Sequence, residues 1–122
     1  MVDDVRETAR RCFACAGACW ETLSTWLAEV DPRSDPPTLL MDCAEICELT
    51  AHVLIRSSTE GRRFSALCAE ICELTAAMAA EHEDLADVVE AARRCARSCR
   101  SFADVTTSRS STHPLAADAR IR

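Results

Sequence analysis

Residues 43–51 read CAEICELTA, and residues 68–76 repeat the same nine letters. In each copy two cysteines stand four positions apart. Residues at i and i+4 lie on one face of an α-helix, so each copy predicts a helix that presents two thiols to the same side. An identity of this length favours an internal duplication over chance convergence. Both copies therefore place two cysteines and a threonine in the same kind of environment.

Apolar residues at helical spacing extend outward from the two copies into four segments that are separated by helix breakers. We predict helices over Asp3–Val30, Thr38–Ser57, Arg62–Glu81 and Leu85–Val105. The connections are the proline-rich loop at 31–37, the turn at 58–61 and residues 82–84. Four amphipathic helices with short loops predict an all-α fold, an antiparallel up-down-up-down four-helix bundle over residues 1–105. The Ser/Thr-rich residues 106–122 are predicted to form a flexible C-terminal tail.

Composition and charge agree with a helical protein and exclude several classes of function. Tyrosine is absent and there are only two glycines, which favours helix over sheet. A net charge of −6 argues against a nucleic-acid binder. No stretch approaches the roughly 20 apolar residues of a membrane span, so no membrane association is expected. The charged N-terminus lacks the apolar region of a secretory signal, which makes the cytoplasm the expected location.

The cysteines form a regular pattern, with one CxxxC pair on each predicted helix. The pairs are Cys15/Cys19, Cys43/Cys47, Cys68/Cys72 and Cys95/Cys99, and Cys12 adds a ninth thiol on the face of the first pair. Helical i,i+4 spacing holds Cβ atoms about 5–6 Å apart, whereas a disulfide needs about 3.8 Å. Two sulfurs that share one metal can lie up to about 4.6 Å apart. The spacing therefore predicts metal sharing rather than a crosslink within each pair.

Counting height along antiparallel helices predicts two compartments in the core. Seven cysteines fall toward the end of the bundle that holds the N-terminus, and Cys43 and Cys47 are expected higher, near the middle. The opposite end is expected to be filled by apolar side chains, namely Leu23, Trp26, Met78 and Val88. Val5, Leu67 and Leu74 are also expected to face inward.

Thiolate chemistry is the function that this pattern favours. A single buried cysteine usually acts as a small hydrophobic residue, but four pairs on inward faces point to metal binding. Soft thiolates select Cu(I), zinc or iron–sulfur clusters. His52 and His82 are candidates for guiding metal entry. No phosphate-binding loop and no Ser/His/Asp arrangement stands out, so we expect no enzymatic activity.

The motifs CFACAGAC at 12–19, MDCAEICELTAHVL at 41–54 and ARRCARSC at 92–99 resemble those of the bacterial copper storage proteins. The likeness covers about residues 8–105. It implies a four-helix bundle with a cysteine-lined bore, Cu(I) bound largely by the CxxxC pairs, frequent homo-oligomers (dimers or tetramers) and cytosolic storage. Typical members carry further cysteines along each helix. The corresponding positions here are Thr22, Trp26, Thr75, Ala79 and Ala92, so we expect a single defined multinuclear site.

The metal itself is left open between two main hypotheses. In the first, the nine cysteines bind several Cu(I) ions for storage, buffering or detoxification, with a copper chaperone as a candidate partner. In the second, the same cysteines hold an iron–sulfur cluster for electron transfer with a redox partner. Against the second, Cys12-x-x-Cys15 is the only CxxC in the sequence. Zinc ranks third, because closed tetrahedral zinc sites usually use CxxC hairpins.

Overall fold

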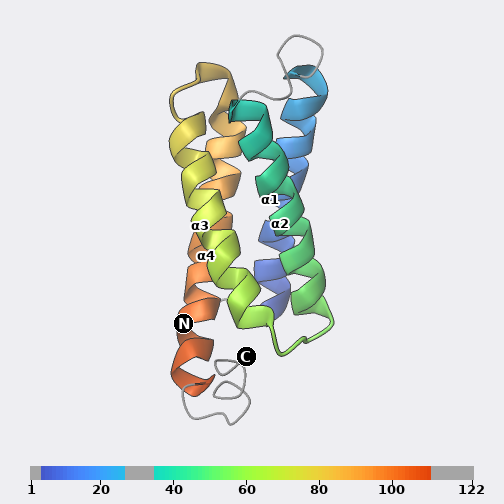
Figure 1. Ribbon diagram of the computed structural model, residues 1–122, viewed down its shortest axis with the longest axis vertical. Coiled ribbons are helices and arrows are strands. Elements are labelled where there is room, and N and C mark those ends of the chain that lie inside the picture. Colours follow the sequence, from blue (N-terminus) through green and yellow to red (C-terminus); the bar gives the residue numbers. More distant parts are fainter. Residues whose placement is uncertain (1–3, 27–34, 111–122) are drawn as a thin grey trace.

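The computed structural model describes residues 4–26 and 35–110. Its elements are α1 (Val5–Trp26), α2 (Asp35–Ile55), α3 (Gly61–Ala79), the short 3-10 helix η1 (Glu83–Leu85) and α4 (Ala86–Ser110). Figure 1 shows four long helices side by side, each running opposite to the one before it. The main contacts join α1 to α2, α3 to α4, α2 to α3 and α1 to α4, which leaves α1 diagonal to α3. The predicted antiparallel four-helix bundle is confirmed.

Local chemistry explains where the helices begin and end. The Asp4 carboxylate accepts a hydrogen bond from the Glu7 amide at 2.8 Å, an N-cap for α1. α2 begins at Asp35, earlier than the predicted Thr38, so Pro36 and Pro37 belong to its first turn rather than to a loop. Proline is tolerated there because the first helical amides have no intrahelical acceptor.

The turn between α2 and α3 depends on Ser57, which precedes the predicted turn at residues 58–61. Ser57 has a positive φ of 55°. Its amide bonds to the Leu54 carbonyl, and the Ser58 amide bonds to the Val53 carbonyl, both at 3.1 Å. This pair of bonds is a Schellman motif, which ends α2 at Ile55. Gly61 instead starts α3.

Three apolar positions that we expected in the core lie on the surface. Val5, Leu67 and Leu74 are 36%, 45% and 58% exposed. Leu67 is adjacent to a core cysteine and Leu74 is two residues beyond another, so each is rotated about 100° or 200° away from the inward face. The small residues cysteine and alanine take the inward positions of these helices.

The core has an apolar end and a cysteine-rich middle. Leu23, Leu40, Leu85 and Val88 are buried, and Trp26 and Met78 pack against the same cluster. The predicted apolar filling of that end is confirmed.

α4 continues past the predicted end at residue 105 as far as Ser110, and the rest of the predicted tail lies outside the described residues. In the described ranges, no helix has both the length and the apolar character needed to cross a bilayer.

Candidate metal centre

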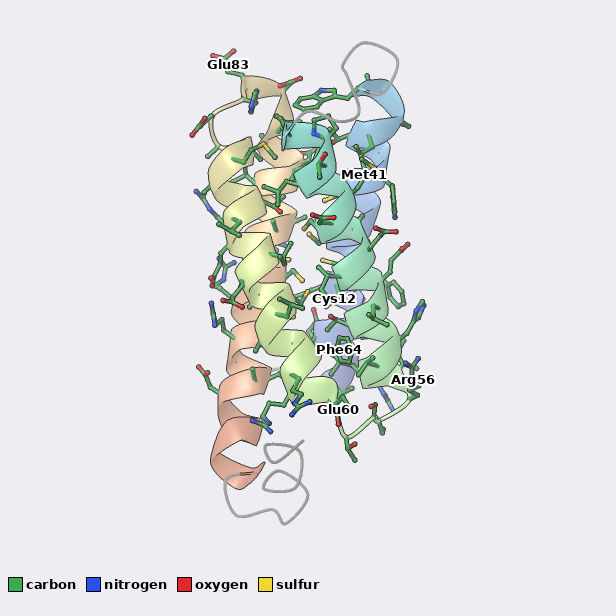
Figure 2. The ribbon with its side chains drawn as sticks, viewed as in Figure 1. Cys12, Met41, Arg56, Glu60, Phe64 and Glu83 are labelled. Atoms are coloured by element: carbon green, nitrogen blue, oxygen red, sulfur yellow. The ribbon has the colours of Figure 1, made fainter. Side chains whose placement is uncertain are left out.

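Every cysteine points into the space between the four helices. All nine are free thiols, and each is 0% exposed. Figure 2 shows their sulfur atoms gathered along the bundle axis, with Cys12 in the lower half. The CxxxC spacing produces this placement because i and i+4 share a face on every helix. The convergence of all nine predicted ligands in one interior space is what the sequence pattern required.

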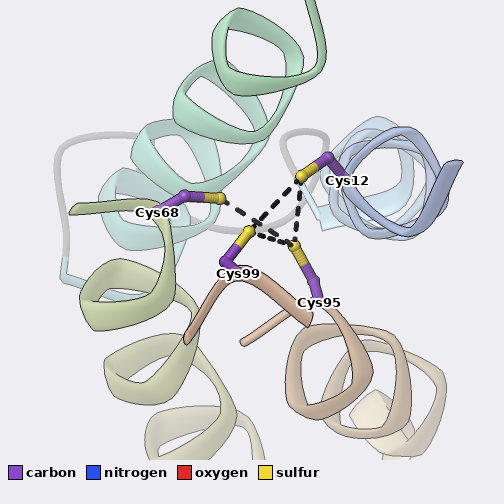
Figure 3. Close-up of side chains that lie close together, drawn as sticks. All are labelled: Cys12, Cys68, Cys95 and Cys99. Atoms are coloured by element: carbon purple, nitrogen blue, oxygen red, sulfur yellow. Dashed lines mark hydrogen bonds between the residues drawn. The ribbon is translucent and has the colours of Figure 1, made fainter. Parts of the chain in front are cut away.

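The end of the cluster nearest the start of α1 is drawn in Figure 3. The Cys95 sulfur lies 3.6 Å from that of Cys12 and 3.8 Å from that of Cys68. The Cys12 and Cys99 sulfurs are also 3.6 Å apart. These four sulfurs come from three helices and lie within 4.8 Å of one another, so a soft ion placed among them would have several ligands within reach.

The middle of the cluster joins all four helices. The shortest distance between sulfurs, 3.5 Å, links Cys47 on α2 to Cys72 on α3. Cys47 also lies 3.9 Å from Cys95 on α4. Cys15 on α1 is 4.0 Å from Cys72 and 3.7 Å from Cys43. The sulfurs therefore form a continuous network rather than four isolated pairs.

Three overlapping groups of sulfurs could each hold a metal ion. They are Cys12/Cys68/Cys95/Cys99, Cys15/Cys47/Cys72/Cys95 and Cys15/Cys19/Cys43. Cys95 belongs to the first two groups and Cys15 to the last two. A metal bound in one group therefore shares a ligand with the next.

Distances across helices are as short as those within the CxxxC pairs. Cys68 and Cys72 are 3.9 Å apart, and Cys95 and Cys99 are 4.0 Å apart, whereas Cys47 and Cys72 on different helices are 3.5 Å apart. A disulfide needs its sulfurs at about 2.05 Å, so none of these contacts is a crosslink. With metal–sulfur bonds of about 2.3 Å, two sulfurs bound in a line are about 4.6 Å apart and three in a plane about 4.0 Å apart. The observed spacing therefore suits bridging of one ion by sulfurs from several helices.

The expected height of two cysteines needs one correction. We predicted that Cys43 and Cys47 lie above the other seven. The Cys47 sulfur is instead 3.7 Å from that of Cys68 and 3.5 Å from that of Cys72, at the level of α3's pair. Counted from the turn, Cys47 precedes the end of α2 at Ile55 by eight residues and Cys68 follows the start of α3 at Gly61 by seven, so antiparallel packing places the two at one level.

Hydrogen bonding within the cluster moves the thiol pKa values in opposite directions. The pKa of Cys12 is raised because Cys68, Cys95 and Cys99 keep its proton within the cluster and because burial disfavours a thiolate. The pKa of Cys95 is lowered, chiefly because its hydrogen-bonding contacts with Cys12 and Cys15 favour its thiolate.

The two candidate histidines lie away from the sulfurs. His52 is exposed and meets Phe13 edge-on, with ring centroids 5.6 Å apart. His82 meets Trp26 in the same way at 5.6 Å, at the apolar end of the bundle. Throughout residues 4–26 and 35–110, the groups able to hold a metal consist of cysteine alone. A role of either histidine in metal entry remains a prediction.

Sequence reasoning placed the threonine of each CAEICELTA copy, Thr50 and Thr75, beside the cysteines, but it missed the buried hydroxyls of Thr8 and Ser65. Thr8, Thr50, Ser65 and Thr75 are all 0% exposed. A signal was available, because each hydroxyl residue lies three or four positions from a core cysteine and so shares its helix face.

Comparison with known proteins gives concordant results. The family model described as copper storage protein matches residues 1–110. Among solved structures, the Cu(I)-bound copper storage protein BsCsp3 is similar, with 29% sequence identity and a TM-score of 0.73. That match covers 80% of this chain and 95% of the other. No curated protein sequence matches the chain.

Proposed function

The chain belongs to the copper storage protein family, and from that premise we propose that its nine core thiols hold several Cu(I) ions as one multinuclear thiolate cluster. The observation that carries this proposal is the set of nine fully buried sulfurs. Eight of them are linked across helices at 3.5 to 4.0 Å, and that of Cys19 lies within 4.8 Å of those of Cys15 and Cys43. Soft thiolates are the ligands that Cu(I) prefers. The function is storage, buffering or detoxification of copper, and it includes no catalytic step.

The ligand set is the nine cysteines, and Cu(I) is the cargo. A sulfur binds Cu(I) as the thiolate, so each thiol that becomes a ligand gives up its proton to solvent. Entry of a positive ion and departure of a proton largely balance in charge. This balance explains how a core from which water is excluded can accept several cations.

The iron–sulfur alternative is less well supported than copper. The sulfurs already touch at 3.5 to 4.0 Å across the core, so iron and inorganic sulfide would have to force the helices apart. A Cu(I) ion needs only the space between two or three sulfurs. The similar solved structure, BsCsp3, is Cu(I)-bound.

Anaerobic titration of the reduced protein with Cu(I) tests the proposal. We expect uptake of several equivalents against a chromophoric Cu(I) chelator, with no visible absorption band from the protein. Elemental analysis of the protein as purified gives an independent reading. Iron with labile sulfide and a band in the blue would overturn the copper assignment, and failure to compete with the chelator would overturn storage.

A reducing compartment suits nine free thiols, so we place the protein in the cytoplasm as part of the proposal.

We also propose that it assembles as a dimer or tetramer. Leu49, Leu67 and Leu74 on α2 and α3 are more than 40% exposed and would be covered by a second copy. Light scattering should give a mass above that of one chain, and a monomer would refute the assembly. A copper chaperone is the proposed donor of the metal.

A further inference from the structure

Two fully buried hydroxyl groups have no hydrogen-bond partner. They are Thr8 Oγ1 and Ser65 Oγ, and both residues are 0% exposed. The other buried threonines are satisfied, since Thr75 donates to the Ile71 carbonyl at 2.8 Å and Thr50 to the Phe64 carbonyl at 3.3 Å. An unpaired buried hydroxyl destabilises a protein and is rare in folded domains. The two exceptions therefore require a reason.

Both hydroxyls lie next to the same end of the sulfur cluster. Thr8 precedes Cys12 by four residues on α1, and Ser65 precedes Cys68 by three residues on α3. These spacings place each hydroxyl residue on the cysteine's helix face, one turn away. α1 and α3 lie diagonally across the bundle, yet the sulfurs of Cys12 and Cys68 belong to one group within 4.8 Å. The two residues with unpaired donors thus lie on diagonal helices, each one turn from a cysteine of the same group of sulfurs.

The opposite end of the cluster differs in character. Leu23, Leu40 and Val88 close it with apolar side chains. Hydrogen-bond donors without partners are therefore confined to one end within the described residues. Such asymmetry is not needed for packing, because alanine and valine would fill the same space without a buried polar atom.

We propose that the hydroxyls of Thr8 and Ser65 donate hydrogen bonds to the sulfurs of Cys12 and Cys68 when those sulfurs hold Cu(I). This inference rests on the proposed function. A thiol sulfur is a weak acceptor, whereas a metal-bound thiolate carries negative charge and accepts strongly. A hydroxyl can rotate to meet it. Hydrogen bonds from the surrounding protein orient metal ligands and strengthen their hold on the metal.

The proposal requires effects of opposite sign in the two states of the protein. In the metal-free protein the two hydroxyls are unpaired, so removing them should leave stability unchanged or raise it. In the copper-loaded protein they are donors, so removing them should weaken binding. A purely structural role would lower stability and copper affinity together.

The test uses the full chain with Thr8→Val, Ser65→Ala, and both changes together. Thr75→Val is the matched control, because its hydroxyl is equally buried and lies three residues from Cys72 but is already donated to the backbone. Thr8→Ser restores the hydroxyl without the methyl group. Each protein is unfolded with urea in the metal-free reduced state and titrated with Cu(I) against a chromophoric chelator.

We expect each single variant to bind its weakest Cu(I) equivalents about tenfold less tightly and the double variant about a hundredfold, the scale of one and two lost hydrogen bonds to charged groups. Its urea midpoint should equal or exceed that of the parent, while Thr75→Val and Thr8→Ser should keep parental affinity. Parental affinity in the double variant would overturn the inference, as would an equal loss in Thr75→Val or a matching loss of metal-free stability. Failure of the parent to bind Cu(I) would instead overturn the proposed function.

Discussion

Cys95 and Cys19 are equally buried, but they hold different places in the sulfur network. Cys95 belongs to two groups of four sulfurs, whereas Cys19 belongs only to the group with Cys15 and Cys43. Both side chains are 0% exposed. Replacing each with alanine therefore makes the same chemical change at the centre and at the edge of the cluster.

The structure sets the expected loss of stability and the expected loss of bound copper in each variant. Removing one buried sulfur leaves a small cavity, which should lower the free energy of unfolding of the metal-free protein by about 1–2 kcal/mol in either variant. The two variants should differ in the number of Cu(I) ions that they bind. Cys95→Ala leaves two groups short of a ligand and should lose about two Cu(I) equivalents, whereas Cys19→Ala should lose about one at most.

The assay is anaerobic Cu(I) titration of the two variants and the parent, with urea unfolding of the metal-free proteins beside it. Equal unfolding midpoints in the two variants would show that the copper difference does not come from stability. If Cys19→Ala lost as much copper as Cys95→Ala, the ions would not be shared through Cys95. The bridged network would then be wrong, even if the protein still bound Cu(I).

Three further predictions concern the cluster and the bundle. The pKa values of Cys12, Cys15, Cys19, Cys47, Cys72 and Cys99 are raised in the fold. Above the ordinary thiol pKa of about 8.5, the unfolded chain loses these protons while the fold keeps them, so metal-free stability should fall as the pH rises. Urea midpoints that stay constant from pH 8 to 10 would contradict this. Replacing Cys68 and Cys72 together with alanine should lower Cu(I) content while circular dichroism keeps its helical signal; unchanged content would remove that pair from the ligand set. Gly17→Ala should raise the free energy of unfolding by about 0.5–1 kcal/mol, because no atom lies within 4 Å of the added Cβ in mid-helix, and a lower urea midpoint would show a hidden clash.

The cysteine positions could be predicted from sequence because the four-residue spacing both indicates a helix and places the two cysteines of each pair on the same face of it. Cys68 and Cys72 are i,i+4 partners on any helix, so their inward direction did not depend on knowing the neighbours. The same reasoning failed for Leu67 and Leu74, because hydrophobicity alone does not say which apolar residues take the limited space around the cysteines. Small side chains occupy that face, and these leucines are left on the surface.

Register between helices was beyond sequence reasoning, for a physical reason. The level of Cys47 relative to Cys68 depends on the turn between α2 and α3, and that turn depends on Ser57 at positive φ. Serine has no strong preference for this conformation, so nothing in the sequence marked it. The unpaired hydroxyls of Thr8 and Ser65 were equally hidden, because hydrogen-bond satisfaction is a property of the packed core.

A storage bundle must stay folded both when it is empty and when it is full, and the division of this core explains how that is possible. Leu23, Leu40, Leu85 and Val88 bury apolar area at one end whether or not metal is present. The sulfur-lined part can then exchange protons for ions without being the sole source of stability. Cysteine suits both states, because a protonated thiol packs as a small apolar group and a thiolate binds the metal. Ala79 and Ala92 are also fully buried, and they add packing that does not depend on copper.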